Sequence, residues 1–239
     1  MSGNPRASVS LADRPWASAP TARRAVSCRC PWGFTLIEIL VVIAIIGLLV
    51  SVVAVKSGTF FKGGKKVKTR AILEQLVLLI EEHQKLTGEY PPSRLDQVRP
   101  NPLSSTIDEN EGIEACLASL LAPNYEGQRI KQDYLENTDD DEADKDFSIF
   151  PKRALFECVD ADGNPLVYIH GKDYGRPQVT LVMNSQSGVY ESVTVQARVD
   201  PKTGTWCNQG SYQLWSPGVD GVFGTGDDVA NFEIEAADD

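Results

Sequence analysis

The sequence predicts an α+β fold in which one long N-terminal α-helix, with a membrane-spanning half and an amphipathic half, packs on a small antiparallel β-sheet. Three observations predict this fold class. Residues 39–55 are 17 consecutive residues without a charge. Residues 65–86 place apolar side chains at three- and four-residue spacings, the period of a helix with one buried face. Beyond residue 155 the chain alternates apolar and polar residues in short runs, as strands do.

The uncharged run has the length of a membrane helix. Together with residues 34–37 it approaches the ~20 residues that span about 30 Å of hydrocarbon. Five arginines precede it and six basic residues follow within residues 56–70, so the charge bias alone does not fix an orientation. A conventional secretory signal places small residues for cleavage after its apolar core. In this chain the obvious processing site lies before the run.

The net charge of −10 is unevenly distributed. Residues 1–33 contain five arginines and one aspartate, so residues 34–239 carry −14. So acidic a body argues against nucleic-acid binding, which needs clustered Lys and Arg to contact phosphates. With only His83 and His170, and without a G-x-S-x-G or H-E-x-x-H motif, the sequence also predicts no enzymatic activity.

The cysteines leave the disulfide state open. Cys28 and Cys30 lie in the basic N-terminal segment, and their spacing is one residue too short for a CxxC metal pair. Cys116, Cys158 and Cys207 belong to the body, where three thiols allow at most one intramolecular disulfide. Three small buried apolar side chains are the alternative.

The amphipathic half extends the predicted helix from about Leu36 to Thr87. Gly88 ends it, and the two prolines at 91–92 prevent it from resuming. Two weak helix-forming pairs, at 57–58 and 63–64, are places where we expect a bend or local melting. The residues predicted to face the body are Val67, Ile72, Leu76, Leu79, Ile80 and Leu86.

Beyond this helix the pattern is less regular. Residues 113–121 predict a short helix, and the acidic run Glu136–Asp146 is interpreted as a solvated loop in preference to a weak calcium site, because no glycine turn organises its oxygens. Strands are predicted within residues 159–169, 179–183 and 189–199, the first after a turn at Gly163-Asn164-Pro165.

One motif carries a family resemblance. Gly33-Phe34-Thr35-Leu36-Ile37-Glu38, followed by the apolar run, resembles the prepilin-type cleavage and methylation motif of type IV pilins and of the pseudopilins of type II secretion. The resemblance implies a pilin-like fold, cleavage after Gly33 by a prepilin peptidase, and N-methylation of Phe34. It also implies a single-pass protein of the bacterial inner membrane with its C-terminal body in the periplasm.

Glu38 is a carboxylate within the apolar run. A charge in hydrocarbon costs about 2.5–3.5 kcal/mol on insertion scales, so we expect it to be paired. After cleavage, the new amino group of Phe34, in the same or the next subunit, is the expected partner. Glu38 is therefore interpreted as an assembly residue that sets the register of helices in a filament, and a lone interfacial carboxylate is the alternative.

The C-terminal stretch 212–228 is rich in aspartate and glycine. Calcium takes six to eight oxygen ligands, and Asp220, Asp227 and Asp228 offer carboxylates while four glycines permit the necessary turns. The stretch resembles the calcium loop of major pseudopilins, which implies further ligands from the backbone carbonyls of Pro217 and Val222. A surface turn that binds no metal is the alternative.

The resemblance as a whole implies a structural subunit of a type II secretion pseudopilus, which polymerises through its N-terminal helix to drive protein export across the outer membrane. A type IV pilin, a minor pseudopilin, or a membrane-anchored calcium-binding ectodomain are the alternatives. Implied partners are further copies of the chain, minor pseudopilins, the prepilin peptidase, inner-membrane lipid, and an inner-membrane assembly platform with a cytoplasmic ATPase.

The predicted organisation has five segments. They are a cleaved basic leader (1–33), a membrane and filament-core helix (34–56), an amphipathic helix (57–88), a variable segment with the acidic loop (89–154), and the antiparallel sheet with the calcium loop (155–239).

Overall fold

The computed structural model of the chain describes residues 34–150, 153–184 and 187–234, and of residues 52–62 it describes the backbone alone. The chain divides into two compact units, Met1–Val50 and Ser51–Asp239. The first contributes the beginning of helix α1, and the second contains the rest of α1 and all other elements.

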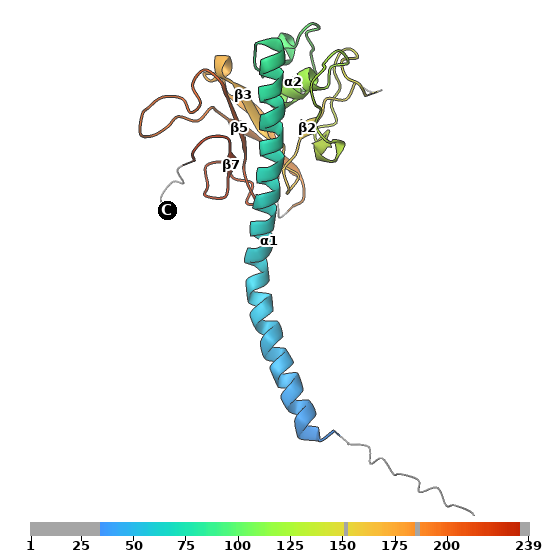
Figure 1. Ribbon diagram of the computed structural model, residues 1–239, viewed down its shortest axis with the longest axis vertical. Coiled ribbons are helices and arrows are strands. Elements are labelled where there is room, and N and C mark those ends of the chain that lie inside the picture. Colours follow the sequence, from blue (N-terminus) through green and yellow to red (C-terminus); the bar gives the residue numbers. More distant parts are fainter. Residues whose placement is uncertain (1–33, 151–152, 185–186, 235–239) are drawn as a thin grey trace, which may run out of the picture. The chain divides into compact units, whose positions relative to one another are not determined.

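Helix α1 runs without interruption through Leu36–Thr87, which confirms the predicted bounds of the long helix (Figure 1). It stays helical through both glycine-containing pairs, where a bend or local melting was expected. Gly88 ends it with φ +88° and donates its N–H to the carbonyl of Gln84 at 2.8 Å. A residue with positive φ directly after the last turn is a common helix stop, and glycine adopts it without steric cost.

The predicted membrane-spanning half of this helix is corrected by the structure. Among the residues whose side chains are described, no helix is both long and apolar enough to cross a membrane. The apolar part of α1 with described side chains, residues 36–51, rises only ~24 Å, against about 30 Å of hydrocarbon, and it includes Glu38. The finding contradicts the pilin-like fold class as we predicted it and the predicted single-pass inner-membrane location with a periplasmic body.

The second half of α1 buries one face in the body of the second unit. Its buried side chains are Thr69, Ile72, Leu73, Leu76, Leu79 and Ile80. The predicted face was right at its centre and wrong at its ends, because Val67 and Leu86 are exposed and Leu73 is buried. At about 100° per residue, Val67 lies opposite Leu76 on the helix, so the two cannot share a face.

Helix α2, Glu111–Leu120, confirms the short helix predicted near residues 113–121. Its residues from Gly112 to Leu120 are all buried. One face contributes to the core cluster that contains the α1 face, and Ala115 and Ala118 contribute to a second cluster with Leu155. A helix covered on all sides has no solvent-facing stripe, so a polar side chain on it must find its partners inside the protein.

Every strand pair in the described residues is antiparallel. The largest sheet has the order β3-β6-β7, formed by Val167–His170, Tyr212–Ser216 and Val229–Ala230. In its register Val167 pairs with Trp215, and Trp215 pairs with Ala230. Successive residues of β3 face opposite sides: Tyr168 joins the core cluster under α1, and its two neighbours join a third cluster with Trp215.

Two further sheets have two strands each. Strand β4 (Gln178–Met183) pairs with β5 (Tyr190–Val195), and β1 (Leu135–Glu136) pairs with β2 (Glu157–Cys158). The described fold is therefore mixed α/β with three small sheets, and the prediction of one sheet is wrong. The physical reason is local, because a 3-10 turn at Gly171–Asp173 follows β3 directly and redirects the chain before β4 begins.

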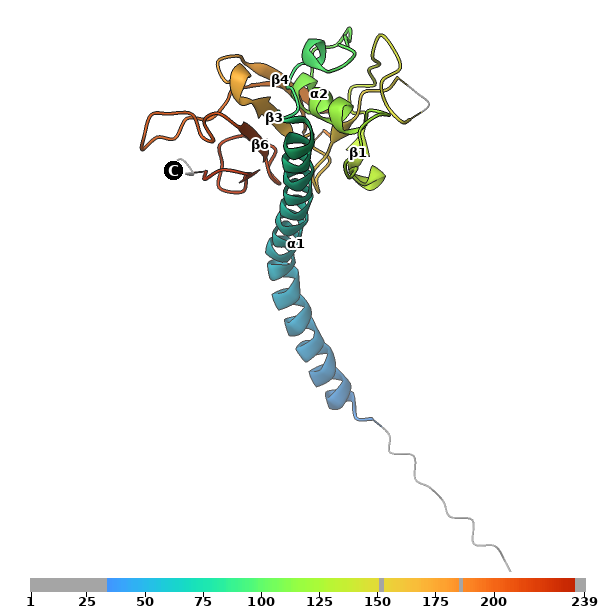
Figure 2. The ribbon, with the colours of Figure 1, turned by 45° about the horizontal axis from the view of Figure 1, so that its top comes forward.

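Within the second unit the strands lie on both sides of α1. Strands β3 and β6 lie to one side, and β1 with β2 lies to the other, together with the acidic segment that precedes β2 (Figures 1 and 2). The body cysteines Cys116, Cys158 and Cys207 are free thiols, and the first two are buried in the core, so the alternative of small buried side chains holds for those two.

Candidate functional site

The described beginning of α1 exposes apolar side chains on every side of the helix. All residues from Phe34 to Ser51 are exposed. Because consecutive residues are rotated by about 100°, an unbroken apolar run covers the whole circumference. The large exposed side chains are Phe34, Leu36, Ile37, Ile39, Leu40, Val41, Val42, Ile43, Ile45, Ile46, Leu48, Leu49 and Val50. Such a surface is stabilised when other apolar groups cover it.

Glu38 is the one charged residue of this stretch, and in the structure it caps the helix. The backbone N–H and the hydroxyl of Thr35 both donate to Oε2 of Glu38, each at 2.8 Å. In return, the backbone N–H of Glu38 donates to the Thr35 hydroxyl at 3.3 Å. This reciprocal pattern is a capping box. These hydrogen bonds lower the pKa of Glu38, and the bond from the Thr35 backbone N–H has a larger effect than the bond from its hydroxyl.

The capping box was readable as Thr-x-x-Glu, and the interpretation of Glu38 as an assembly residue alone missed it. Gly33, the predicted cleavage position, lies outside the described residues. Phe34 is described and 77% exposed. Its N-methylation, and the pairing of its amino group with Glu38, stay predictions.

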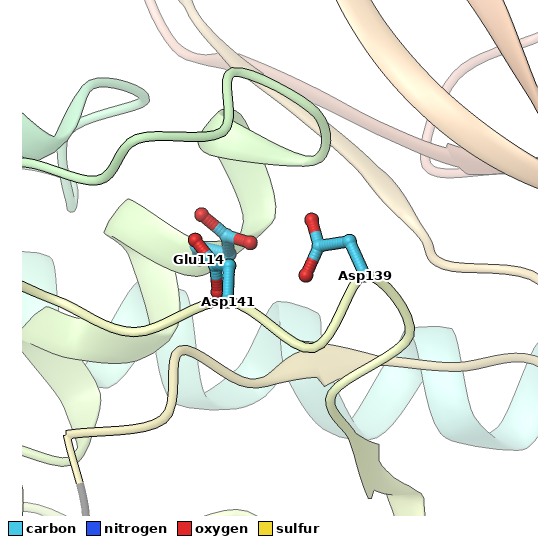
Figure 3. A group of neighbouring side chains, drawn as sticks. All are labelled: Glu114, Asp139 and Asp141. Carbon is cyan, nitrogen blue, oxygen red and sulfur yellow. The ribbon is translucent and has the colours of Figure 1, made fainter.

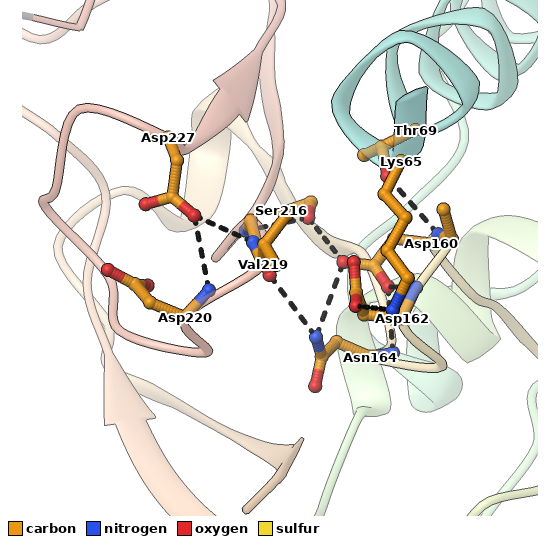
Figure 4. Close-up of polar contacts among 11 residues, drawn as sticks. Lys65, Thr69, Asp160, Asp162, Asn164, Ser216, Val219, Asp220 and Asp227 are labelled. Atoms are coloured by element: carbon orange, nitrogen blue, oxygen red, sulfur yellow. Dashed lines mark hydrogen bonds and ion pairs between the residues drawn. The ribbon is translucent and has the colours of Figure 1, made fainter. Parts of the chain in front are cut away.

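The predicted calcium loop is the connection between β6 and β7. Its three aspartates accept hydrogen bonds mainly from the loop itself, and those of Asp227 to the backbone of Val219 and Asp220 are drawn in Figure 4. Asp227 Oδ2 accepts the backbone N–H groups of Val219 at 2.8 Å and Asp220 at 3.1 Å. Asp228 Oδ2 accepts the N–H of Gly224 at 2.7 Å. The loop is therefore organised by carboxylate-to-amide hydrogen bonds.

Further contacts of the loop follow the same scheme. Asp220 Oδ1 accepts the N–H of Val222 at 2.8 Å, and the Val222 carbonyl accepts the Thr225 hydroxyl at 3.3 Å. Pro217 is buried. Burial raises the pKa of Asp227, but hydrogen bonds from Thr225 and from the loop amides outweigh it, so the net pKa is below its usual value.

The spacing from Asp220 to Asp227 does bring the two residues together, but through a backbone amide. Among the described residues, only Glu114, Asp139 and Asp141 place three oxygens within 4.8 Å of one another, so the loop aspartates do not form such a set. The loop thus fits a calcium ion less well than expected, and calcium binding there stays a prediction.

A polar network joins this loop to the turn at Gly163-Asn164-Pro165 and to α1 (Figure 4). The Ser216 hydroxyl donates to Asp160 Oδ2 at 2.6 Å, and Asn164 Nδ2 reaches the carbonyl of Gly218 at 3.5 Å. Lys65 on α1 forms an ion pair with Asp162 at 2.6 Å. The Asp-rich turn before β3 is therefore an anchor for the loop.

A second acidic group, which the sequence reasoning missed, lies beside α2. Glu114 comes from α2, and Asp139 and Asp141 come from the acidic run (Figure 3). Glu157, from β2, belongs to the same group because its charge acts on Glu114. Glu114 is 1% exposed, Asp141 2% and Glu157 0%. The interpretation of residues 136–146 as a solvated loop is thus wrong for Asp141, which is buried, and for Asp139, which is half-buried. We call these four residues the buried carboxylate cluster.

Burial dominates the electrostatics of this cluster. Burial, followed by the charges of Asp141, Glu157 and Asp139, raises the pKa of Glu114 well above its usual value. Burial also raises the pKa of Asp139 and Glu157, and it raises that of Asp141 to about 6. Four carboxylates in one place disfavour ionisation unless a proton or a cation neutralises them.

The sequence held only a weak signal for the cluster. Glu114 is the one charged residue in the apolar stretch Ile113–Leu121, and Glu157 stands between Phe156 and Cys158. Isolated acids in buried elements indicate a functional or paired group, but neither position says what the partner is.

The two histidines line one polar cavity of about 660 Å³, together with Arg99, Lys172 and Asp173. Burial lowers the pKa of both His83 and His170. His83 Nδ1 lies 3.1 Å from the carbonyl of Glu89, whereas His170 Nδ1 accepts the N–H of Lys172 at 3.0 Å.

In comparisons with known proteins, no family model, no curated protein and no solved structure matches this chain.

Proposed function

We propose that this chain is a non-catalytic structural subunit of a filament of the type II secretion pseudopilus kind, and that it polymerises through the segment Phe34–Val50. The observation that supports the proposal is the apolar surface around the whole circumference of this segment. The Gly33–Glu38 motif, with its resemblance to prepilins, agrees with it.

The energetic argument concerns the exposed side chains. Fully burying one Leu, Ile, Val or Phe side chain stabilises by about 1.5–3 kcal/mol. The side chains in question are between 46% and 85% exposed. A bundle of such helices from several copies buries most of this surface at once, and the gain grows with the number of neighbours. A second copy of the same helix is the natural cover, because each copy offers the same apolar surface.

Glu38 gives the assembly its register in this proposal. A prepilin peptidase cleaves after Gly33, and the freed and methylated amino group of Phe34 is then a cation near the Glu38 carboxylate. Once neighbouring copies exclude water, an unpaired Glu38 would be costly, whereas a paired one is tolerated. The capping bonds from Thr35 hold the carboxylate at the start of the helix. Minor pseudopilins and an ATPase-driven assembly platform are the further partners of this proposal.

The experiment co-expresses the full-length chain with a prepilin peptidase and an assembly platform. Mass spectrometry checks cleavage after Gly33 and methylation of Phe34, and negative-stain microscopy checks for filaments. Glu38→Ala is compared with Glu74→Ala, a matched control on the same helix whose exposed carboxylate lies 3.2 Å from Arg70. We expect filaments from the wild type and from Glu74→Ala, and at least a tenfold loss with Glu38→Ala.

The outcomes separate the possible assignments. Cleavage without filaments, unless a second pilin-like subunit is supplied, would favour a minor pseudopilin. Long surface filaments would favour a type IV pilin. An uncleaved chain, or equal filament yields from both glutamate variants, would refute the proposal.

A further inference from the structure

We propose that Glu114, Asp139 and Asp141 bind a hard divalent cation, with calcium as the first choice, and that this cation ties helix α2 to the acidic run. The site is distinct from the Asp220–Asp228 loop for which the sequence predicts calcium. Figure 3 shows the three side chains directed toward one another from two separate segments.

The unusual group in this site is Glu114. Both of its carboxylate oxygens are buried, and among the described residues neither accepts a hydrogen bond from an N–H or hydroxyl group. The neighbouring polar group is the carboxyl of Glu157, itself an acid, which can only share a proton with Glu114. Its helix is buried from Gly112 to Leu120, so the side chain does not point directly into bulk water. A buried carboxylate without a donor costs far more than an ordinary unsatisfied polar group, so a ligand for these oxygens is expected.

In each of the other two carboxylates, the two oxygens have different surroundings. One oxygen of each is held by the protein: Asp141 Oδ2 accepts the Ser105 hydroxyl, and Asp139 Oδ2 lies 3.5 Å from Asn110 Nδ2. The remaining oxygen of each, Asp139 Oδ1 and Asp141 Oδ1, is buried and accepts no hydrogen bond from a donor group in the described part of the chain. The anchored oxygens fix the orientation of the two carboxylates, and one oxygen from each residue lies within 4.8 Å of an oxygen of Glu114.

Among the described residues, no basic side chain forms an ion pair with a member of the cluster, and two that belong to or follow the acidic run pair with other acids. Arg153 pairs with Glu142 at 3.3 Å, and Lys145 lies 3.5 Å from Asp144. In the described part of the chain, the cluster therefore carries no compensating positive charge, which is what a bound cation would supply. Asp139 is half-buried, so the cluster reaches the surface on that side.

The donor set selects the class of cation. It contains carboxylate oxygens only, which suit calcium, magnesium or manganese better than zinc or copper. Two oxygens bound to one calcium ion at about 2.3–2.6 Å can be up to ~5 Å apart, and the three oxygens here lie within 4.8 Å of one another. Magnesium needs shorter, strictly octahedral distances, so it is the weaker candidate.

The test uses the full-length chain in mild detergent. Thermal unfolding is measured in calcium and in chelator at equal ionic strength, and calcium binding is measured by isothermal titration calorimetry. At calcium a hundredfold above the dissociation constant, we expect the wild-type midpoint to rise by roughly 5–10 °C. Glu114→Gln should abolish this shift and weaken binding at least tenfold. In chelator, the same variant should unfold at the wild-type temperature or higher, because a buried charge has been removed.

Two further variants keep the test decisive. Asp139→Asn changes the half-buried member of the set, so it tests the site even if Glu114→Gln does not fold, and it should also lose the shift. Asp220→Asn changes the exposed aspartate of the β6–β7 loop and should keep the full shift. A wild type that does not respond to calcium, a shift that survives Glu114→Gln or Asp139→Asn, or a shift lost in Asp220→Asn would each overturn the proposal.

Discussion

Leu76→Ala tests whether the second half of α1 is an integral part of the body. Leu76 is 0% exposed and lies in the core cluster with residues of α2, β3 and β6. Truncating a fully buried leucine removes its transfer free energy and leaves a cavity, at a cost of about 2–5 kcal/mol. A central value of about 3 kcal/mol corresponds to a decrease of roughly 6–12 °C in the unfolding midpoint of a domain this size.

The matched control is Leu78→Ala, two residues further along the same helix. Leu78 is 70% exposed, because about 200° of rotation places it opposite Leu76. We expect Leu78→Ala to change the free energy of unfolding by less than about 0.5 kcal/mol. The change in helix propensity is the same in both variants, because each replaces a leucine by an alanine. Circular dichroism melts in chelator provide the readout, and similar midpoints for the two variants would refute the assigned packing face.

Two further predictions concern a turn and the histidine cavity. Gly218 has φ +70°, and a Cβ there would meet the facing backbone at 2.6 Å, so Gly218→Ala should destabilise by more than about 1 kcal/mol in chemical denaturation; Gly175→Ala, which meets nothing within 4 Å, is the control and should be near neutral. Because burial lowers the pKa of His83 and His170, their contribution to stability is complete above the unfolded pKa of about 6.5 and is lost as the pH falls below it. When the pH is lowered from 7.5 to 5.5, the thermal unfolding midpoint of the double variant His83→Gln, His170→Gln should therefore fall by less than that of the wild type. An equal or larger fall would contradict this assignment.

Local patterns were sufficient for several elements. The end of α1 at Thr87 followed from Gly88, and α2 followed from the apolar stretch beginning at Ile113. The centre of the α1 packing face also followed from helical periodicity, because the rotation per residue is fixed by backbone geometry. The same geometry explains the errors at the ends of that face, where Val67 and Leu86 continue an apolar spacing but have rotated out of the interface.

Local sequence patterns did not predict the hydrogen-bond partners of the carboxylates in the candidate sites. The seven-residue spacing of Asp220 and Asp227 predicted two carboxylates that share a calcium ion, and in the structure the contact between the two residues is from the Asp220 amide to the Asp227 carboxylate. Glycine spacing predicts that a turn forms, whereas the donors available to each carboxylate depend on the direction of every peptide group in the loop. The capping bonds of Glu38 with Thr35 are different, because they are local and the Thr-x-x-Glu pattern does predict them; the interpretation of Glu38 as an assembly residue overlooked that pattern.

The sequence by itself determined the long helix, its stop, the short second helix, and the apolar run at residues 39–55. Only the tertiary structure decided that the strands form three sheets and that Glu114 meets Asp139 and Asp141 from a segment some 25 residues away. The physical reason is that helix periodicity and turn chemistry act over a few residues, whereas the burial and pairing of a carboxylate depend on which distant segments the chain folds against it.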